Sequence, residues 1–340
     1  MRILTLDHYE AHADYLRAVR EFFHSRDFLE VETPLLNSCG AVEAHLDSLL
    51  VQRQGIRKSP DAPEAHGRAS DAPAGYLITS PEYNLKIVLA HLKRSLFQVA
   101  HSFREEDIGP IHSEEFLMLE WYLVGADEFA LMDQCEELLR HLCAQNFCRI
   151  SLPSETFARR SVTRLLQQYA DCPDFSRASI IAALQRDGLL DPSNSNAPDS
   201  PKADVDATPY EDLFFSLFLN RVEPHLGRTG PEFVYDYPPE LAALSRVTDG
   251  RARRFEIYWD RIELANGYYE LNDGQEQRRR FVAENLARRA AGKPEMQPDP
   301  QFLAALDHGL PDCSGVALGL DRLFMLLRNA RTLDQVSIFT

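Results

Sequence analysis

The sequence lacks the cysteine pattern of a zinc site or of a disulfide framework. Its six cysteines form no Cys-x-x-Cys pair and no Cys/His spacing typical of zinc. No hydrophobic run approaches the roughly 20 residues that a membrane-spanning helix needs. Residues 1–6 are too brief for the apolar part of a signal peptide, because Asp7 and His8 follow at once. These absences predict a cytoplasmic protein with reduced thiols and no membrane partner.

Positive charge is also scarce. The chain has 36 Lys and Arg against 52 Asp and Glu, a formal net charge of −16 over 340 residues. A protein that mainly binds a phosphate backbone is usually basic, because neutralising phosphates supplies much of that affinity. The acidic balance therefore argues against nucleic acid as the main partner, although a few well-placed arginines suffice for a nucleotide.

The composition is that of a folded protein, with 44% hydrophobic and 10% aromatic residues. Strand-like and helix-like segments follow one another in irregular order, which favours an α+β fold with an antiparallel sheet over a doubly wound parallel one. Residues 54–75 and 188–209 are rich in Pro, Asp and Ser and are interpreted as loop-like insertions. We therefore expect one domain over residues 1–340.

Hydrophobic periodicity predicts the elements that carry the candidate residues. Helices are predicted over residues 12–24, 82–92, 128–142, 210–222, 275–291 and 321–329. Strands are predicted over residues 28–33, 76–79, 95–103, 116–123, 233–237, 254–258 and 261–265. The strands at 95–103 and 116–123 are expected to pair.

The first candidate constellation runs from Arg104 through Glu106 and a polar loop to Phe116. A guanidinium fork can hold two phosphate oxygens at once, and an aromatic ring offers a face to a nucleotide base. A strand–loop–strand hairpin would place both groups on one side of a sheet. A surface hairpin with solvated charges explains the same residues equally well.

The second constellation is a pair of glutamates, Glu256 and Glu263. A two-residue turn at Asp260–Arg261 would place Tyr258 opposite Glu263, with Glu256 on the same face. Two carboxylates so close repel each other unless a cation lies between them, and Mg²⁺ shared with ATP phosphates would fit. For an isolated pair, two solvent-facing glutamates are the simpler interpretation.

Two further segments combine small and polar residues. Asn266 and Glu270 flank Gly267, and their amide and carboxylate could bind two ends of a polar ligand; on the local pattern alone, the Asn-Gly pair predicts a turn. In residues 315–322, small residues at alternate positions would let a ligand lie flat on a strand, with Arg322 at the start of a helix. A strand of small residues packed under a helix is the alternative.

In this order the segments resemble the class II aminoacyl-tRNA synthetases, and within them the lysyl branch. The helix and strand that end at Pro34 look like the first motif of that family, FREEDIGPIHSEEF with LEWY like the second, and GVALGLDR like the third. SPEY and ELANGYYELND resemble lysyl-type signatures. The resemblance covers residues 12–335 and implies an antiparallel α+β catalytic fold, and its first motif implies a homodimer.

The resemblance also points within the lysyl branch. Lysyl-tRNA synthetases carry an amino-terminal anticodon-binding domain, and a first-motif helix that begins near residue 12 leads us to expect none here. A free-standing core is similar to the ligases that attach (R)-β-lysine to elongation factor P, and MLEWY, IELANG and PDCSGVALG extend the similarity. In those ligases an alanine at the position of Ala317, in place of a glycine, goes with acceptance of the β-amino acid.

The resemblance implies that ATP and Mg²⁺ are used to activate lysine or (R)-β-lysine as its adenylate, with release of pyrophosphate. Arg104 and Arg322 are the implied catalytic residues, the first on the α-phosphate and the substrate carboxylate, the second stacking adenine against Phe116. The other implied roles are Glu106 and His112 as nucleotide contacts, Glu256 and Glu263 as ligands of the ATP-bound Mg²⁺, Glu270 and Tyr122 on the side-chain ammonium, Glu82 and Glu120 on the other amino group, and Asn266 on the carboxylate.

A lysine of elongation factor P would then attack the adenylate. Two alternatives stay open. A minimal enzyme that charges tRNA is disfavoured by the expected lack of an anticodon domain and by the charge of −16. A non-catalytic lysine-binding paralogue is disfavoured because the arginines and the paired glutamates are all present.

Overall fold

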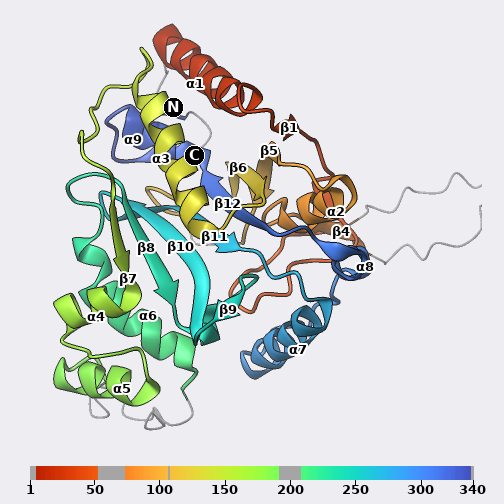
Figure 1. The fold of residues 1–340 in the computed structure, drawn as a ribbon, viewed down its shortest axis with the longest axis vertical. Coiled ribbons are helices and arrows are strands. Elements are labelled where there is room, and N and C mark those ends of the chain that lie inside the picture. Colours follow the sequence, from red (N-terminus) through yellow and green to blue (C-terminus); the bar gives the residue numbers. More distant parts are fainter. Residues whose placement is uncertain (1–4, 53–72, 106–107, 191–207, 338–340) are drawn as a thin grey trace, which may run out of the picture.

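The structure of the chain, a computed structural model, describes residues 5–52, 73–105, 108–190 and 208–337. Most of the two expected insertions, at 54–75 and 188–209, lies outside these residues, and so does Glu106. Helices surround a mainly antiparallel sheet, so the predicted α+β class is confirmed (Figure 1).

Nine α-helices occur in the described part of the chain. They are α1 Leu6–His24, α2 Glu82–Leu92, α3 Glu128–Cys143, α4 Val162–Ala170, α5 Arg177–Arg186, α6 Tyr210–Arg221, α7 Gly274–Ala290, α8 Pro300–Gly309 and α9 Leu320–Leu327. The six predicted helices are confirmed, whereas α4, α5 and α8 were not predicted. Aspartates at 127, 273 and 299 accept backbone N–H groups at the starts of α3, α7 and α8, which fixes where these helices begin. None of the described helices is both long and apolar enough to cross a membrane.

The strands form two sheets in the described residues. They are β1 Leu29–Glu30, β2 Leu36–Asn37, β3 Leu50–Gln52, β4 Pro73–Leu77, β5 Leu96–Phe103, β6 Glu115–Val124, β7 Ala158–Ser161, β8 Glu232–Tyr237, β9 Val247–Thr248, β10 Arg251–Trp259, β11 Ile262–Tyr269 and β12 Cys313–Gly319. The large sheet has the order β1-β5-β6-β12-β11-β10-β8-β7, with β9 beside β10; the small one has the order β2-β4-β3. Among the strands of the described residues, only the β1–β5 and β7–β8 pairs are parallel.

One face of the large sheet packs on helices. Trp121, Val316, Ala265 and Ile257, from four adjacent strands, belong to the same buried cluster as the inner residues of α1, α3 and α9. In Figure 1, α4, α5 and α6 lie beside β7 and β8 at one end of the sheet, and α2 and α8 lie at the other end. Because side chains alternate along a strand, the residues between these core positions face away from α1, α3 and α9.

The structure tests one predicted strand and two predicted turns. The strand predicted over residues 28–33 is reduced to Leu29–Glu30, where it pairs with β5. The Asp260–Arg261 turn is confirmed, with positive φ angles of 50° and 67° at its two residues. The turn expected from Asn266 and Gly267 is wrong, because both lie inside β11. A Cβ at Gly267 would stand 2.4 Å from the Phe255 ring, so this glycine allows close packing and does not bend the chain.

Candidate active site

Polar side chains stand in register on the sheet face that turns away from α1, α3 and α9. One row crosses four strands and consists of Glu120, Ala317, Asn266 and Glu256. The neighbouring row consists of Tyr122, Gly315, Tyr268 and Arg254. Three segments that are far apart in the sequence therefore contribute to one surface.

A β-bulge sets the position of the paired glutamates. Ile257 pairs with Ala265, but Tyr258 pairs with Glu263, so Leu264 is an extra residue in β11. The predicted pairing of Tyr258 with Glu263 is confirmed. Glu256 faces Asn266 across the hairpin, which a regular register would not give.

Two adjoining cavities open on this face. The larger has a volume of about 520 Å³ and is lined in part by Glu82, Arg254, Glu256 and Tyr268. The smaller has a volume of about 140 Å³ and is lined in part by His112, Phe116 and Arg322. The residues common to both walls are Arg104, Glu263, Asn266 and Ala317. Two ligands, one in each cavity, would therefore meet at Arg104.

The smaller cavity has an arginine on each side. The guanidinium of Arg104 lies 5.3 Å from the Phe116 ring centroid, and its Nε donates to the Thr79 carbonyl at 3.3 Å. Arg322 donates to the carbonyls of Ile111 and Glu263, both at 3.1 Å. Backbone carbonyls thus orient both guanidinium groups, and a flat ring between Phe116 and Arg322 would contact two planar faces.

The paired glutamates differ in their surroundings. Glu256 is buried and accepts hydrogen bonds from Arg254, from the Tyr237 hydroxyl at 2.5 Å and from the Tyr258 hydroxyl at 2.7 Å. Glu256 is therefore not solvent-facing, and it already has a cationic partner in Arg254. Glu263 is exposed to the cavities, yet the surrounding cleft still desolvates its carboxylate. This desolvation and the charge of Glu256 raise its pKa to about 7.

Two carboxylates are a small ligand set for a metal. Among the described residues, no group of three or more His, Cys, Asp or Glu comes together as a metal site. Mg²⁺ commonly takes one or two carboxylates and completes its shell with phosphate oxygens and water. Glu256 and Glu263 fit that case and would not hold a cation without ligand oxygens from outside the chain.

A buried lysine joins two of the predicted substrate residues. The Lys86 ammonium lies 2.5 Å from Glu82 Oε1 and 2.6 Å from Glu270 Oε2, and its side chain is 1% exposed. Burial alone would lower the pKa of Lys86, but the carboxylates of Glu270 and Glu82 outweigh it and raise the pKa above its ordinary value. Lys86 is therefore expected to be positively charged at neutral pH.

Two more of the predicted substrate residues, Tyr122 and Glu120, also contact each other. The Tyr122 hydroxyl donates to Glu120 Oε1 at 2.6 Å. Burial and the charge of Glu82 raise the pKa of Glu120 well above its usual range. The sequence-based roles paired Glu270 with Tyr122 and Glu82 with Glu120, whereas the structure joins Glu82 to Glu270 through Lys86.

The predicted substrate residues that carry a carboxylate or hydroxyl group differ in how deeply they are buried. Glu82 lines the larger cavity, but Glu120, Tyr122 and Glu270 are buried behind its wall. Gly315 makes room for them, because a Cβ there would lie 2.3 Å from Tyr122 Cε1 and 2.5 Å from Glu270 Oε1. The glycine of the third motif therefore has a packing reason in this chain.

Two acceptor atoms in the first row stay unsatisfied. Glu120 Oε2 and Asn266 Oδ1 are buried and have no hydrogen-bond partner among the described residues. They stand on either side of Ala317, which faces Glu120 on one neighbouring strand and Asn266 on the other. A buried acceptor without a donor is costly, so this row is suited to a ligand that carries N–H groups.

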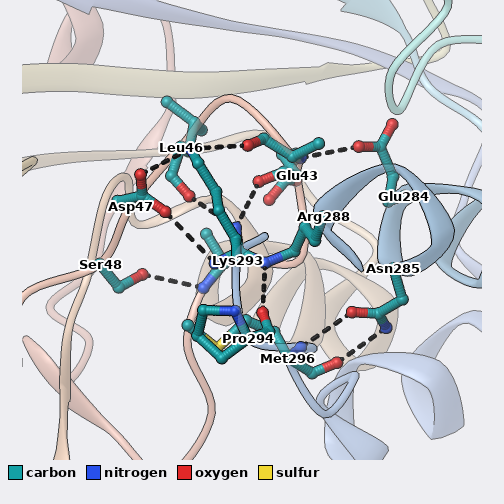
Figure 2. A network of polar contacts seen from close by, with 12 residues as sticks. Glu43, Leu46, Asp47, Ser48, Glu284, Asn285, Arg288, Lys293, Pro294 and Met296 are labelled. Carbon is teal, nitrogen blue, oxygen red and sulfur yellow. Dashed lines mark hydrogen bonds and ion pairs between the residues drawn. The ribbon is translucent and has the colours of Figure 1, made fainter. Parts of the chain in front are cut away.

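One wall of the larger cavity is held by α7 and the segment after it (Figure 2). Arg288, whose side chain is 1% exposed, donates to the carbonyls of Glu43 and Leu46 at 3.0 and 3.1 Å and lies 3.2 Å from Asp47 Oδ1. Lys293 contacts the other Asp47 oxygen at 2.7 Å. Glu43 and Leu46 both line the cavity, so this network fixes the shape of its wall.

Lys86, Arg254 and Tyr237 were not predicted as site residues. Tyr258 was predicted on the face of Glu256 but not as its hydrogen-bond partner. A signal existed for Lys86, because it lies four residues after Glu82 and so on the same side of the helix. It also occupies the buried side of α2 together with Leu85 and Leu89. A lysine among the apolar positions of a helix predicts a buried partner.

Comparison with known proteins agrees with this geometry. Residues 7–340 match the family described as tRNA synthetases class II (D, K and N). Among similar proteins, one from Yersinia enterocolitica is 38% identical over 339 residues, and one from Hamiltonella defensa is 36% identical over 341 residues. Each alignment covers 96% of this chain and 93% of the relative. Both relatives are named elongation factor P–(R)-β-lysine ligase.

Proposed function

Because the chain belongs to the class II tRNA synthetases (D, K and N), we propose that it is a ligase that activates (R)-β-lysine or lysine with ATP and transfers it to a lysine side chain of elongation factor P. The names of its relatives support the substrate and the acceptor. The observation that carries the proposal is the row in which Glu120 and Asn266 flank Ala317 with two unsatisfied acceptors.

The amino acid would occupy the larger cavity. Its ammonium groups would neutralise the carboxylates of Glu82, Glu120 and Glu270, since a buried carboxylate needs a cationic partner. The Tyr122 hydroxyl orients Glu120 in that group. The carboxylate of the substrate would meet Arg104 and the Asn266 amide where the two cavities join.

ATP would occupy the smaller cavity, with adenine between Phe116 and Arg322 and with His112 as a further contact. Glu106 is proposed as a contact on the resemblance alone, because it lies outside the described residues. Glu256 and Glu263 would hold Mg²⁺, which supplies neutralisation of phosphate charge when bound.

Arg104 would align the substrate carboxylate with the α-phosphate. The carboxylate oxygen forms a bond to phosphorus, the bond to the pyrophosphate oxygen breaks, and the adenylate results. Orienting two bound reactants can lower a barrier by about 7–11 kcal/mol, so no side-chain nucleophile is needed. In the second step the acceptor amine displaces AMP and loses a proton.

Ala317 would distinguish (R)-β-lysine from α-lysine as substrate. Ala317 lines the wall common to both cavities, and the reacting carboxylate would lie beside it. A β-amino acid carries its amino group one carbon farther from that carboxylate than an α-amino acid does. A methyl group at this position therefore fits a substrate whose amino group has moved away.

We also propose a cytoplasmic homodimer. The α1 helix of the first motif leaves Leu6 and Tyr9 71% and 49% exposed, which an interface between copies would cover. The six cysteines are free, as in the reducing cytoplasm. Sedimentation at micromolar concentration tests the dimer: a monomer would contradict it, and Tyr9→Glu should weaken the dimer while Leu286→Glu, on exposed α7, should not.

ATP–pyrophosphate exchange with (R)-β-lysine and α-lysine side by side tests the activation step. The proposal expects strong exchange with (R)-β-lysine. Exchange with α-lysine alone would favour a tRNA-type enzyme, and no exchange with either would favour a non-catalytic protein. Arg104→Ala serves as the inactive control.

A further inference from the structure

The Lys86 ammonium lies among the proposed substrate carboxylates, yet no step of the reaction uses it. Resting on the proposed function, we propose that Lys86 is a positioning residue: it fixes Glu82 and Glu270 and sets the pocket charge so that an amino acid with two ammonium groups is bound. It would thus help to select a diamino acid from other amino acids.

The position of Lys86 on α2 is costly without such a role. Its neighbours on the buried side of the helix are Leu85, Leu89 and Ala90. A lysine there loses its hydration, and the attraction of a single carboxylate offsets only part of this desolvation free energy. Two carboxylates within 2.6 Å supply the compensation.

The two carboxylates come from elements that are fixed independently. Glu82 begins α2, whereas Glu270 directly follows β11. Its N–H donates to the Cys313 carbonyl at 3.0 Å, and its carbonyl accepts from Arg246 Nε at 2.7 Å. In the described part of the chain, Lys86 links their side chains. Removing it would leave the buried Glu270 and the cavity-lining Glu82 without the contact that sets their positions.

Lys86 also sets the net charge of the pocket. Glu82, Glu120 and Glu270 carry three negative charges when ionised, and Lys86 reduces the sum to two. A diamino acid brings two ammonium groups, and its carboxylate is directed to Arg104. Without Lys86, three carboxylates would repel one another and retain protons, which an incoming ammonium would have to displace.

The test compares Lys86→Gln, Lys86→Arg and wild type in the exchange assay. Glutamine keeps donors for both carboxylates but removes the charge, and we expect the KM for the diamino acid to rise at least about tenfold. The kcat and the KM for ATP should stay within about twofold, because an interaction made equally in the ground and transition states changes KM alone. Arginine should restore the KM to within about threefold.

Leu89→Ala is the control for a weakened α2, because it removes packing on the same side of the helix and leaves the charges intact. An unchanged KM for the diamino acid in Lys86→Gln overturns the inference. The inference is also overturned if Lys86→Gln changes kcat, the KM for the diamino acid and the KM for ATP together, and Leu89→Ala causes the same changes. If Lys86→Gln does not fold, Lys86→Arg decides: a KM near wild type supports the inference, and a tenfold increase overturns it. Absence of exchange by wild type with either lysine would overturn the proposed function as well; exchange by wild type with an unaffected Lys86→Gln overturns the inference alone.

Discussion

Glu120 lies directly opposite Ala317 in the antiparallel pair of β6 and β12. The alanine methyl therefore stands beside a buried carboxylate, and the residue lines both cavities. A change of one methyl group at this position alters the space next to the site proposed for an ammonium group of the substrate. This relationship gives the proposed substrate preference a test.

Ala317→Gly should shift the preference from (R)-β-lysine toward α-lysine. Removing the methyl opens space near the reacting carboxylate, where the α-amino group has to fit. One methyl or methylene group changes discrimination by about 10- to 200-fold, so we expect a shift of at least about tenfold in the ratio of the two kcat/KM values.

Ala252→Gly is the matched control for Ala317→Gly. It makes the same change in β10 of the same sheet, at a buried residue that lines neither of the two cavities. The ratio of the kcat/KM values for (R)-β-lysine and α-lysine should not change in this variant. An equal ratio in Ala317→Gly and wild type would remove Ala317 from the account of specificity.

Arg104→Ala should abolish adenylate formation without unfolding the protein. The guanidinium lies where the cavities join, and removing one donor that stabilises developing charge costs about 100- to 1,000-fold in rate. Pyrophosphate exchange and circular dichroism measure the two parts of the prediction. Arg94→Ala, which removes an exposed arginine, should keep full activity. Normal exchange by Arg104→Ala would refute the assigned role.

Arg288→Ala should strongly destabilise the fold. The change leaves two carbonyls and Asp47 with fewer partners in a buried network, and breaking such a network costs about 3–5 kcal/mol. Arg289→Ala, next in α7, removes an exposed ion pair with Glu295 and should cost about 1 kcal/mol at most. Urea unfolding of the two variants compares them, and similar losses would contradict the importance of the network in Figure 2.

Binding of the diamino acid should improve as pH rises from about 6 to 8. Burial, offset in part by the charge of Lys86, raises the pKa of Glu270 from 4.5 to about 7. The folded protein thus holds a proton that the unfolded chain releases, and this contribution to stability is lost as pH rises from 4.5 to about 7. An ammonium group binds the ionised form, so the KM falls across the same pKa.

The pH prediction is measured as the KM for the diamino acid in wild type and Glu270→Gln. Below the pKa of Glu270, the affinity of wild type should increase up to about tenfold for each unit by which the pH rises. The affinity of the variant should increase less. Glu120 also has a raised pKa, so a smaller dependence is expected to remain. Identical pH profiles for the two proteins would show that Glu270 does not titrate in binding.

The sequence predicted the fold class, six of the nine α-helices in the described residues and the Asp260–Arg261 turn. These features depend on local periodicity and turn chemistry, which one sequence displays. It could not predict the bulge at Leu264, because register depends on the partner strand. The Asn266–Gly267 pair wrongly predicted a turn for a related reason: close packing on Phe255 and a turn both favour glycine.

The candidate site was predicted as a set of residues but not as a set of contacts. Arg104, Phe116, Arg322 and Glu263 line the smaller cavity as a shared site would require. The partners of Glu256 and the bridge from Glu82 to Glu270 through Lys86 come from residues that lie together only after folding. Contacts of this kind follow from the three-dimensional structure.

Mass spectrometry of purified elongation factor P tests the central claim most directly. The factor is incubated with this protein, ATP and (R)-β-lysine, with reactions lacking ATP or containing Arg104→Ala as controls. The account predicts an ATP-dependent mass increase of one lysyl residue on a single lysine of the factor, absent from both controls. An unmodified factor under conditions in which the protein exchanges pyrophosphate with (R)-β-lysine would contradict it.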